Sequence, residues 1–226
     1  MFMYLELTID ARSSNSLKPI FESIDLQVYD NNSSFDISQA LIEFDHESIS
    51  IVQHSSNLGS TGNFKAAFFA HKYTKYFCIF HDDDLMDPRY CALAIEYLDL
   101  HQETSWVASQ HRTFHENSIL YTDTRNVPCP FQDYSSSDLS RNLIYSNIDF
   151  SFCSVIYRSS LLSDIDREEF NRLSTRYSIV MDRPLLFDLL SIGSKCAITQ
   201  SKMIDSYIHP GQDSKTGPLQ FENIVS

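Results

Sequence analysis

Basic residues, glycines and long apolar runs are scarce in this sequence. Lysine and arginine number 17 against 30 acidic residues, which gives a formal net charge of -13. Because nucleic acids and anionic lipid surfaces attract proteins through cationic patches, this charge predicts no nucleic-acid partner. No apolar run approaches the ~20 residues of a membrane span. The opening MFMYLELTID lacks the basic and apolar regions of a signal peptide.

Cysteines are few and scattered, at positions Cys78, Cys91, Cys129, Cys153 and Cys196. Their number is odd and no CxxC pair occurs, so a disulfide framework or a zinc site is not expected. We predict free, buried thiols in a protein of the reducing cytoplasm.

Strand and helix patterns alternate over the first 100 residues. Strands are expected at 3–9, 26–29, 49–54 and 76–80, with helices at 17–24, 36–44, 63–72 and 87–101. This order predicts an α/β fold with a mostly parallel, Rossmann-like central sheet and helices on both faces. Apolar residues make up 42% of the chain, which is enough for a substantial core.

The second half of the chain has a less regular pattern. Segments 106–114 and 118–123 are predicted to form a hairpin, and 150–158 and 195–199 are predicted strands. Helices are expected near 138–146 and within 178–190, and the tail from 209 onward reads as a flexible loop.

An acidic cluster, HDDD, directly follows the apolar run YFCIF. Adjacent carboxylates repel one another, and hard divalent ions such as Mg²⁺ and Mn²⁺ prefer their oxygens. A solvated turn, or acids at a helix N-terminus, is the alternative interpretation of the cluster alone. Asp30, Asn57 and the cluster all fall at predicted strand ends, where parallel sheets bind ligands.

Several segments together resemble glycosyltransferase family 2. YDNNSSFD is similar to the family's DN-x-S-x-D loop, NLGSTGNFKAAFFA to its N-x-G-x-x-x-N segment, and IFHDDDLMDP to its DxD metal motif. Further along, Met181-Asp182 stands where the family carries an acidic motif at a helix start, and YIHPGQDS resembles its closing loop. The resemblance implies a GT-A (nucleotide-diphospho-sugar transferase) fold and transfer of a sugar from a nucleotide to a hydroxyl with inversion.

The resemblance also implies roles for single residues. The donor nucleotide-sugar would contact Asp30, Asn57, Gly59, Asn63, Asp82 and Asp83. A divalent ion, Mn²⁺ or Mg²⁺, would bind Asp82, Asp84 and His209, although the metal pair within Asp82–Asp84 stays open. Asp182 would be the catalytic base, but an aspartate before Arg183 and Pro184 also suits a helix N-cap. His209 is equally compatible with an ordinary surface histidine.

The resemblance places residues 1–226 in one GT-A domain. Residues 1–100 would form its nucleotide-sugar half, and 101–226 its acceptor half with the flexible tail. We expect a UDP-sugar donor and a glycan or lipid-linked oligosaccharide acceptor in bacterial surface polysaccharide (O-antigen or capsule) synthesis. We expect the hexosyltransferase to be cytoplasmic, with peripheral association at the inner face of the membrane.

Two other functions compete with this interpretation. A non-catalytic nucleotide-sugar-binding or scaffold module would keep the fold but lose the acidic residues, which are present here. A sugar nucleotidyltransferase would carry a glycine-rich loop near its start, whereas the first glycine of this chain is Gly59.

Overall fold

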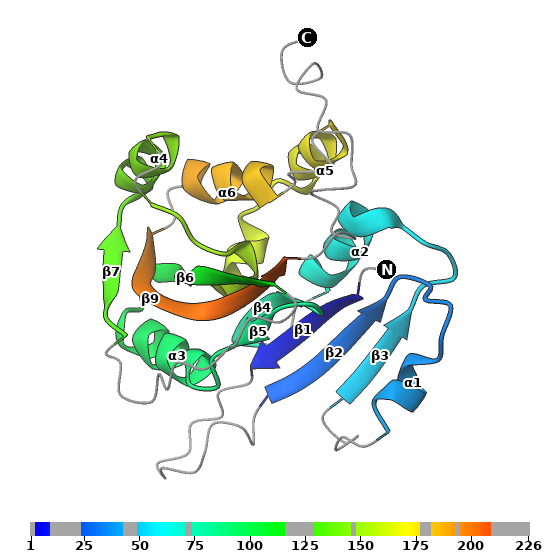
Figure 1. The fold of residues 1–226 in the computed structure, drawn as a ribbon. Helices are drawn as coiled ribbons and strands as arrows, with labels where there is room; N and C mark the ends of the chain where they lie inside the picture. Colours follow the sequence, from blue (N-terminus) through cyan, green and yellow to red (C-terminus); the bar gives the residue numbers. More distant parts are fainter. Residues whose placement is uncertain are drawn as a thin grey trace.

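The computed structural model describes residues 3–9, 24–42, 49–70, 74–115, 129–145, 148–176, 182–192 and 195–208. Within them lies one nine-stranded sheet with the order β3-β2-β1-β4-β8-β6-β9-β5, in which β7 also pairs with β9 (Figure 1). Its strands are β1 (Met3–Ile9), β2 (Ile24–Asp30), β3 (Ile49–Gln53), β4 (Tyr76–His81), β5 (Leu85–Met86), β6 (Thr104–His115), β7 (Phe131–Tyr134), β8 (Ile156–Arg158) and β9 (Lys195–Ile208).

Helices cover both faces of the sheet. They are α1 (Ile37–Ala40), α2 (Gly59–Phe68), α3 (Tyr90–Leu100), α4 (Ser136–Ile144), α5 (Arg167–Arg176) and α6 (Asp182–Ser191), with 3₁₀ turns η3 (Phe152–Ser154) and η4 (Ser159–Ser163). Helices α2, α4, α5 and α6 pack on one face and α3 on the other (Figure 1). The predicted covering of both faces is confirmed.

Strand β4 separates two apolar cores because successive side chains of a strand point to opposite faces. Phe77 and Ile79 belong to the core beneath α2, α4, α5 and α6, whereas Tyr76, Cys78 and Phe80 belong to the core beneath α3. All five side chains are buried, as the continuous apolar run predicts. Both cores also contain residues from beyond position 100, so the sheet joins the two predicted halves.

The sheet is mixed in direction. Strands β2, β3, β4, β6 and β9 run one way, whereas β1, β5, β7 and β8 run the other way. The predicted parallel direction therefore holds for β2, β3 and β4, but β1 lies antiparallel to both of its neighbours. Antiparallel neighbours can be joined by a loop and need no helical crossover.

Several predicted elements differ from the structure in extent. Helix α2 begins at Gly59, four residues before the predicted start. The strand predicted at 195–199 extends to Ile208 as β9. It continues through the polar stretch Gln200–Lys202, where its pairing with β6 shifts register. The predicted strand over 150–158 is interrupted by η3, whose residue Ser154 bonds backbone groups with its side chain.

Three described elements were missed in the sequence: the two-residue strand β5, helix α5, and strand β7 in the segment 125–140, which the sequence predicts to be a loop. Helix α5 is mostly polar and buries only Phe170 and Ser174 among its residues, so few apolar positions mark it in the sequence. Strand β7 is four residues long within a segment read as a loop. The predicted strand at 118–123, the tail from 209, and the predicted helix at 17–24 except Ile24 lie outside the described residues; Ile24 itself begins β2.

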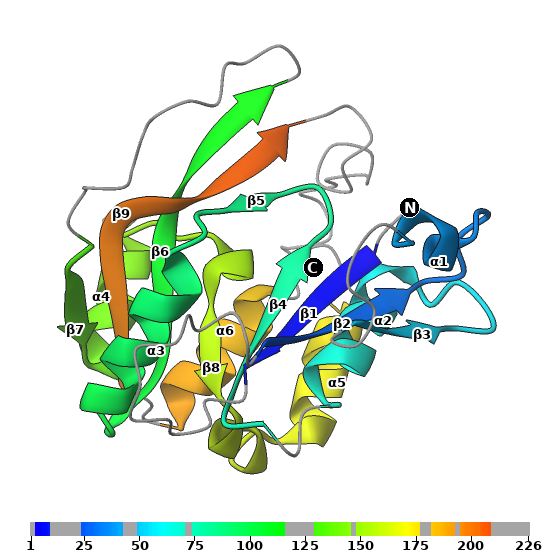
Figure 2. The same ribbon diagram turned by 90° about the horizontal axis from the view of Figure 1, so that it is seen from below.

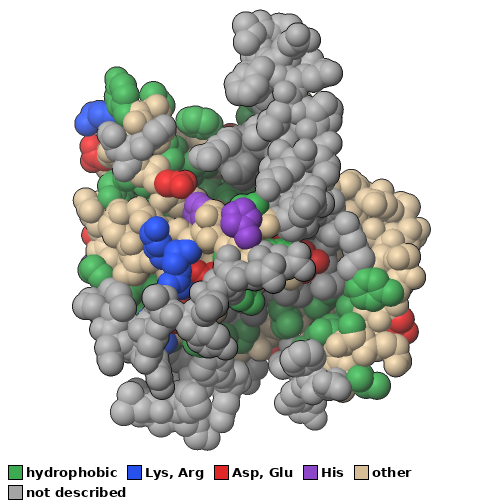
Figure 3. Space-filling model, viewed as in Figure 1, with side chains coloured by type: hydrophobic (Ala, Val, Ile, Leu, Met, Phe, Trp, Pro, Cys, Tyr) green, Lys and Arg blue, Asp and Glu red, His purple; other side chains and the backbone are tan. Residues whose placement is uncertain are grey.

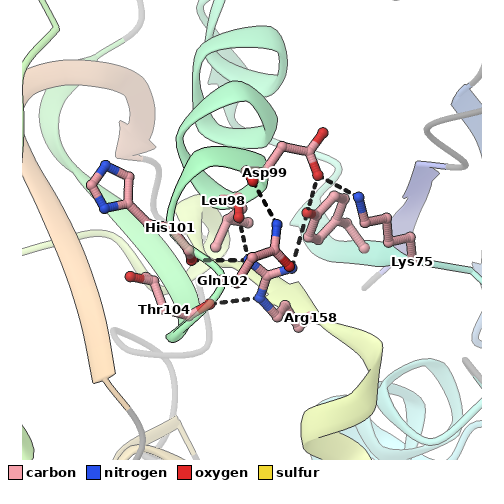
Figure 4. Close-up of polar contacts among 8 residues, drawn as sticks. Lys75, Leu98, Asp99, His101, Gln102, Thr104 and Arg158 are labelled. Atoms are coloured by element: carbon pink, nitrogen blue, oxygen red, sulfur yellow. Dashed lines mark hydrogen bonds and ion pairs between the residues drawn. The ribbon is translucent and has the colours of Figure 1, made fainter. Parts of the chain in front are cut away.

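A guanidinium group anchors the start of β4 (Figure 4). Arg158 donates hydrogen bonds to the backbone oxygens of Thr104 (2.7 Å), His101 (3.0 Å) and Leu98, and to the Tyr76 hydroxyl (3.0 Å). The carbonyls of Leu98 and His101 belong to the last turn of α3 and its C-cap, which lack intrahelical donors. Arg158 therefore ties β8 to the end of α3 and to β4.

Candidate active site

Asp30 ends β2 with a buried carboxylate that accepts a hydrogen bond at each oxygen. Oδ1 accepts the backbone N–H of Ser33 (2.9 Å), and Oδ2 accepts the side-chain amide of Gln53 (2.9 Å). Burial by itself would raise the pKa of Asp30, but the hydrogen bonds from Ser33 and Gln53 and the nearby His54 outweigh it and lower the pKa. Asp30 is therefore an anion held by the loop that follows it.

The next residue, Asn31, joins this loop to the start of α2. Its buried side chain donates to Asn57 Oδ1 (3.0 Å) and to the Gly59 carbonyl (3.2 Å), and it accepts the N–H of Leu58 (2.7 Å). Asn57 Oδ1 also accepts the Gly59 N–H (2.8 Å). Gly59 has φ +71°, a conformation that favours glycine although a Cβ would meet nothing within 4 Å. Asn57 and Gly59 thus lie at the surface on a preformed turn.

Asn63 is buried on α2 and faces the ends of β2 and β3. Its amide donates to the Tyr29 carbonyl (3.1 Å), and its oxygen accepts from His54 Nε2 (2.9 Å). The His54 backbone N–H in turn donates to the Asp30 carbonyl (2.9 Å). These contacts bring Asp30, Asn57, Gly59 and Asn63 together as one polar network, which we call the β2–α2 network.

The acidic cluster lies in the turn after β4. The Asp84 side chain is 6% exposed, and its carboxylate accepts the Tyr207 N–H at Oδ1 (3.1 Å) and the Cys153 thiol at Oδ2 (2.8 Å). His81 Nδ1 lies 3.7 Å from the same Oδ2. Asp82 is exposed and Asp83 half-buried. The three aspartates therefore stand in three different environments.

The two clusters occupy one edge of the sheet. Met3 pairs with Asp30 and Tyr4 pairs with His81, so the first residues of β1 separate the ends of β2 and β4. Neighbouring strands lie ~4.8 Å apart, which places the backbones of Asp30 and His81 roughly 10 Å from each other. The sequence prediction that strand ends bring these side chains to a common rim agrees with this register.

The donor atoms near Asp84 suit a divalent cation. One ligand atom each from His81, Asp84 and Cys153 lies within 4.8 Å of the others. Carboxylate oxygen and imidazole nitrogen are donors that Mn²⁺ accepts, and carboxylate is what Mg²⁺ prefers. Burial raises the pKa of the Cys153 thiol well above its ordinary value, and the Asp84 charge raises it further. Because the thiol is neutral, the members of this set that suit a divalent cation are the Asp84 carboxylate and the His81 imidazole.

A two-stranded arm borders the acidic cluster. Figure 2 shows β5 beside the ends of β6 and β9, which run together beyond the rest of the sheet. Arg112 of β6 contacts both oxygens of Asp205 of β9, at 2.5 and 3.0 Å, and Leu85 of β5 pairs with Asp205. Histidine and basic side chains gather near the middle of the face drawn in Figure 3. Basic side chains and histidines therefore lie on this face despite the net charge of -13.

Two predicted residues are described less fully. Asp182 begins α6, as the sequence predicts, but its side chain lies outside the described residues. His209 also lies outside them, directly after the last described residue of β9. Their predicted roles stay predictions.

A family model described as "Glycosyl transferase family 2" matches residues 6–166 of the chain. The chain belongs to this family. Membership places it among the glycosyltransferases, as the motifs predict, and the expected GT-A fold class is confirmed. No curated protein matches the chain in sequence.

Two solved structures share the fold. S. aureus TarS 1–349 in complex with UDP is 14% identical with a TM-score of 0.57, and the match covers 81% of this chain and 51% of that one. A second structure of S. aureus TarS 1–349, whose description names no UDP, is also 14% identical with a TM-score of 0.56. That match covers 80% of this chain and 50% of the TarS chain. This family 2 chain therefore spans about half the length of the TarS chain.

Four residues of the site were not singled out in the sequence: Asn31, His54, Cys153 and Tyr207. The family loop contains Asn31, so its place beside Asp30 was a usable signal. His54 follows a predicted strand, which was a weaker signal. Cys153 and Tyr207 are 69 and 123 residues from Asp84, and no local pattern reveals those contacts. Within the described residues, no helix is long and apolar enough to cross a membrane.

Proposed function

We propose that this family 2 chain transfers a sugar, with inversion, from a nucleoside-diphosphate sugar to a hydroxyl acceptor. The observation that carries the proposal is the common rim formed by the β2–α2 network and the acidic cluster on either side of β1. A nucleotide sugar needs polar groups for its base and ribose and charge compensation for its diphosphate. The rim offers polar groups for the base and ribose beside Asp30. Beside Asp84 it offers carboxylates that would hold a cation to compensate the charge of the diphosphate.

The donor nucleotide would lie against the β2–α2 network. Asn57 and Gly59 are exposed on the preformed turn and can contact a ligand directly. Asp30 and Asn63 are buried and bonded within the protein, so in this arrangement they hold the pocket's shape. We propose that Asp30 also contacts base or ribose once the donor binds, and that Asp82 and Asp83 contact the ribose.

The donor's diphosphate would lie beside the acidic cluster. Asp82 and Asp84 would hold a divalent cation, Mn²⁺ or Mg²⁺, with His209 joining from the segment after β9. When bound, the cation neutralises the charge of the leaving nucleoside diphosphate. Asp84 is fixed by two hydrogen bonds to its carboxylate, which suits a ligand whose position must not vary.

On the acceptor side, Asp182 would act as the general base. An inverting displacement needs one base on the face opposite the leaving group. Asp182 is the first residue of α6, and this helix packs over the same core as α2. Its carboxylate would take the proton of the attacking acceptor hydroxyl as the bond to the anomeric carbon forms.

The donor carrier is proposed to be UDP, which the description of the TarS complex also names. We further propose a single domain over 1–226, with a donor half at 1–100 and an acceptor half at 101–226. The acceptor would be a glycan or lipid-linked oligosaccharide of a bacterial surface polysaccharide, met by a cytoplasmic enzyme at the inner face of the membrane.

Calorimetric titration of UDP, GDP, dTDP and CMP with Mn²⁺, and then with EDTA, tests the proposal. We expect UDP to bind only with Mn²⁺, and Asp82→Asn with Asp84→Asn to lose that binding. Asp182→Asn should bind UDP normally and yet transfer no sugar. Folded protein that binds none of these nucleotides would overturn the proposal and favour a scaffold module.

A further inference from the structure

The turn η3 is fixed from several sides at the centre of the molecule. Ser151 and Ser154 bind β6, through Ser151 N–H to the Ser109 carbonyl (3.1 Å) and Ser109 N–H to Ser154 Oγ (2.9 Å). From β4, the Cys78 thiol donates to the Cys153 carbonyl (3.4 Å). From α3, the Tyr90 hydroxyl donates to the Ser154 carbonyl (2.7 Å). Cys153 therefore has little freedom to move.

The side chain of Cys153 points from this turn to the acidic cluster. Its sulfur is buried and lies 2.8 Å from Asp84 Oδ2, and Ser151 Oγ lies 2.9 Å from the same sulfur. Because a thiol has one hydrogen and a carboxylate has none, the thiol donates to Asp84. The Ser151 hydroxyl then donates to the sulfur. A continuous line of contacts thus runs from β6 through η3 to Asp84.

The opposite oxygen of Asp84 is held from a different strand. Tyr207 of β9 donates its backbone N–H to Oδ1 at 3.1 Å. One donor on each oxygen fixes the rotation of the carboxylate plane and leaves further lone pairs on both oxygens. A substitution can remove the Cys153 donor but not the Tyr207 backbone donor. Because His81 Nδ1 lies 3.7 Å from Oδ2, beyond hydrogen-bond distance, Cys153 is the described side chain that donates to Asp84.

We propose that Cys153 is a positioning residue, whose thiol orients the Asp84 carboxylate for the divalent cation. The inference deepens the proposed function and rests on it for the cation, although not for the hydrogen bond. Donors that hold a metal-binding side chain in place typically change metal affinity when they are removed. Cys153 acts through Asp84 and does not itself need to touch the cation or the nucleotide.

Infrared absorption by the S–H group tests the hydrogen bond without any metal. We expect the S–H band that disappears in Cys153→Ala to lie below the frequency of a free thiol, and to rise toward it in Asp84→Asn. A Cys153 band at the free-thiol frequency in the unmodified protein would overturn the inference. Cys153→Ser serves as the second variant if alanine leaves the protein unfolded.

Titration of Mn²⁺ in the presence of UDP tests the consequence for the cation. Cys153→Ala should weaken Mn²⁺ binding about tenfold, and Cys153→Ser, which restores a donor, should recover it to within about threefold. Cys196→Ala removes another buried thiol, one without a contact to Asp84, and should change nothing.

Two outcomes separate this inference from the proposed function. If the unmodified protein binds no Mn²⁺ with UDP, the proposed function fails. If it binds Mn²⁺ and Cys153→Ala binds it equally well, only the positioning role fails. A thiolate charge-transfer absorption on adding Cd²⁺, together with no recovery in Cys153→Ser, would make Cys153 a direct ligand and would also overturn its positioning role.

Discussion

The two ends of β4 both carry charged side chains, yet they are built differently. At its start, Arg158 donates to three carbonyls and to Tyr76, while Asp99 accepts from Tyr76 and Lys75. Positively and negatively charged side chains lie together at this end, and each is hydrogen-bonded to other groups of the protein. At its finish, Asp82–Asp84 place three carboxylates in succession, and the described residues that donate to the Asp84 carboxylate do so from uncharged groups, the Cys153 thiol and the Tyr207 N–H.

This difference separates a structural charge network from a candidate site. Ion pairs that protein partners saturate contribute to stability and leave nothing for a ligand. Three carboxylates in succession repel one another, and a bound cation relieves this repulsion. The start of β4 should therefore govern stability, and the finish should govern activity.

The strongest test of this contrast is Asp84→Asn. Loss of the carboxylate charge should lower kcat/KM by at least about 1000-fold, because the charge of the leaving diphosphate is no longer compensated. The melting temperature should fall only a little, because relief of the repulsion from Asp82 and Asp83 offsets the cost of pointing the amide N–H₂ at Cys153 or at the Tyr207 N–H. Steady-state transfer assays and thermal unfolding measure both effects.

The proposed difference between the two ends of β4 would be wrong if Asp84→Asn unfolded the protein or kept near-normal turnover. Asp138→Asn is the control, because Asp138 is exposed on α4, lies 3.6 Å from Arg141, and accepts a hydrogen bond from Ser135 Oγ (2.6 Å) that an amide oxygen can also accept. That variant should match the unmodified protein in both assays.

The opposite end is tested by Arg158→Ala. Removal of the guanidinium takes the Arg158 donor from the Leu98 carbonyl and breaks its bonds to Thr104, His101 and Tyr76, and should cost about 3 kcal/mol of unfolding free energy. Urea unfolding measures the loss. Folded Arg158→Ala should still bind UDP and Mn²⁺ with unchanged affinity.

Arg141→Ala provides the comparison for Arg158. The Arg141 side chain is 67% exposed, so its removal should cost less than about 0.5 kcal/mol. Equal losses in the two arginine variants would show that the network at the start of β4 has no special structural role.

The acidic cluster at the end of β4 could be predicted from the sequence, whereas the distant residues that contact it could not. A buried apolar run followed by HDDD is a local pattern, and the order of the elements predicts a common rim for Asp30 and His81. The start of α6 at Asp182 was also local, since it follows from Asp-Arg-Pro. Each of these predictions uses residues close together in the chain.

Contacts between distant segments explain what was missed. Arg158 meets Leu98 and Tyr76, and Cys153 meets Asp84, only because β8 and η3 lie beside β4. The antiparallel direction of β1 also depends on pairing that no side-chain pattern reveals. Such contacts are decided by the tertiary arrangement, so periodicity and motifs cannot supply them.

Asp30 combines features of the two ends of β4. It lies at the rim beside the candidate site, but its carboxylate accepts hydrogen bonds from protein donors, as the charged groups at the start of β4 do. Asp30→Asn would point an amide N–H₂ at the donor of Ser33 or Gln53 and should cost about 1–3 kcal/mol at neutral pH. Its lowered pKa stabilises the fold above the ordinary aspartate range, and this contribution is lost as pH falls through the folded-state pKa.

Urea unfolding of both proteins from pH 7 to pH 2 tests the Asp30 prediction. The difference between the unmodified protein and Asp30→Asn should shrink below about pH 4. A difference that stays constant with pH would mean that the charge of Asp30 does not contribute to stability. Asp25→Asn, on the same strand but exposed, is the control.

The smallest expected effect is that of Lys75→Ala at the start of β4. The Lys75 side chain is 45% exposed and its partner Asp99 is 39% exposed, so solvent screens the pair and its loss should cost less than about 1 kcal/mol. The hydrogen bond with Asp99 raises the pKa of Lys75. Its contribution is therefore complete at neutral pH and is lost as pH rises through the folded-state pKa. Urea unfolding at low and high salt, with the exposed Lys195→Ala as control, measures it. A loss as large as that of Arg158→Ala would show that Lys75 and Arg158 act as one unit, and that burial does not rank the charges at this end of the strand.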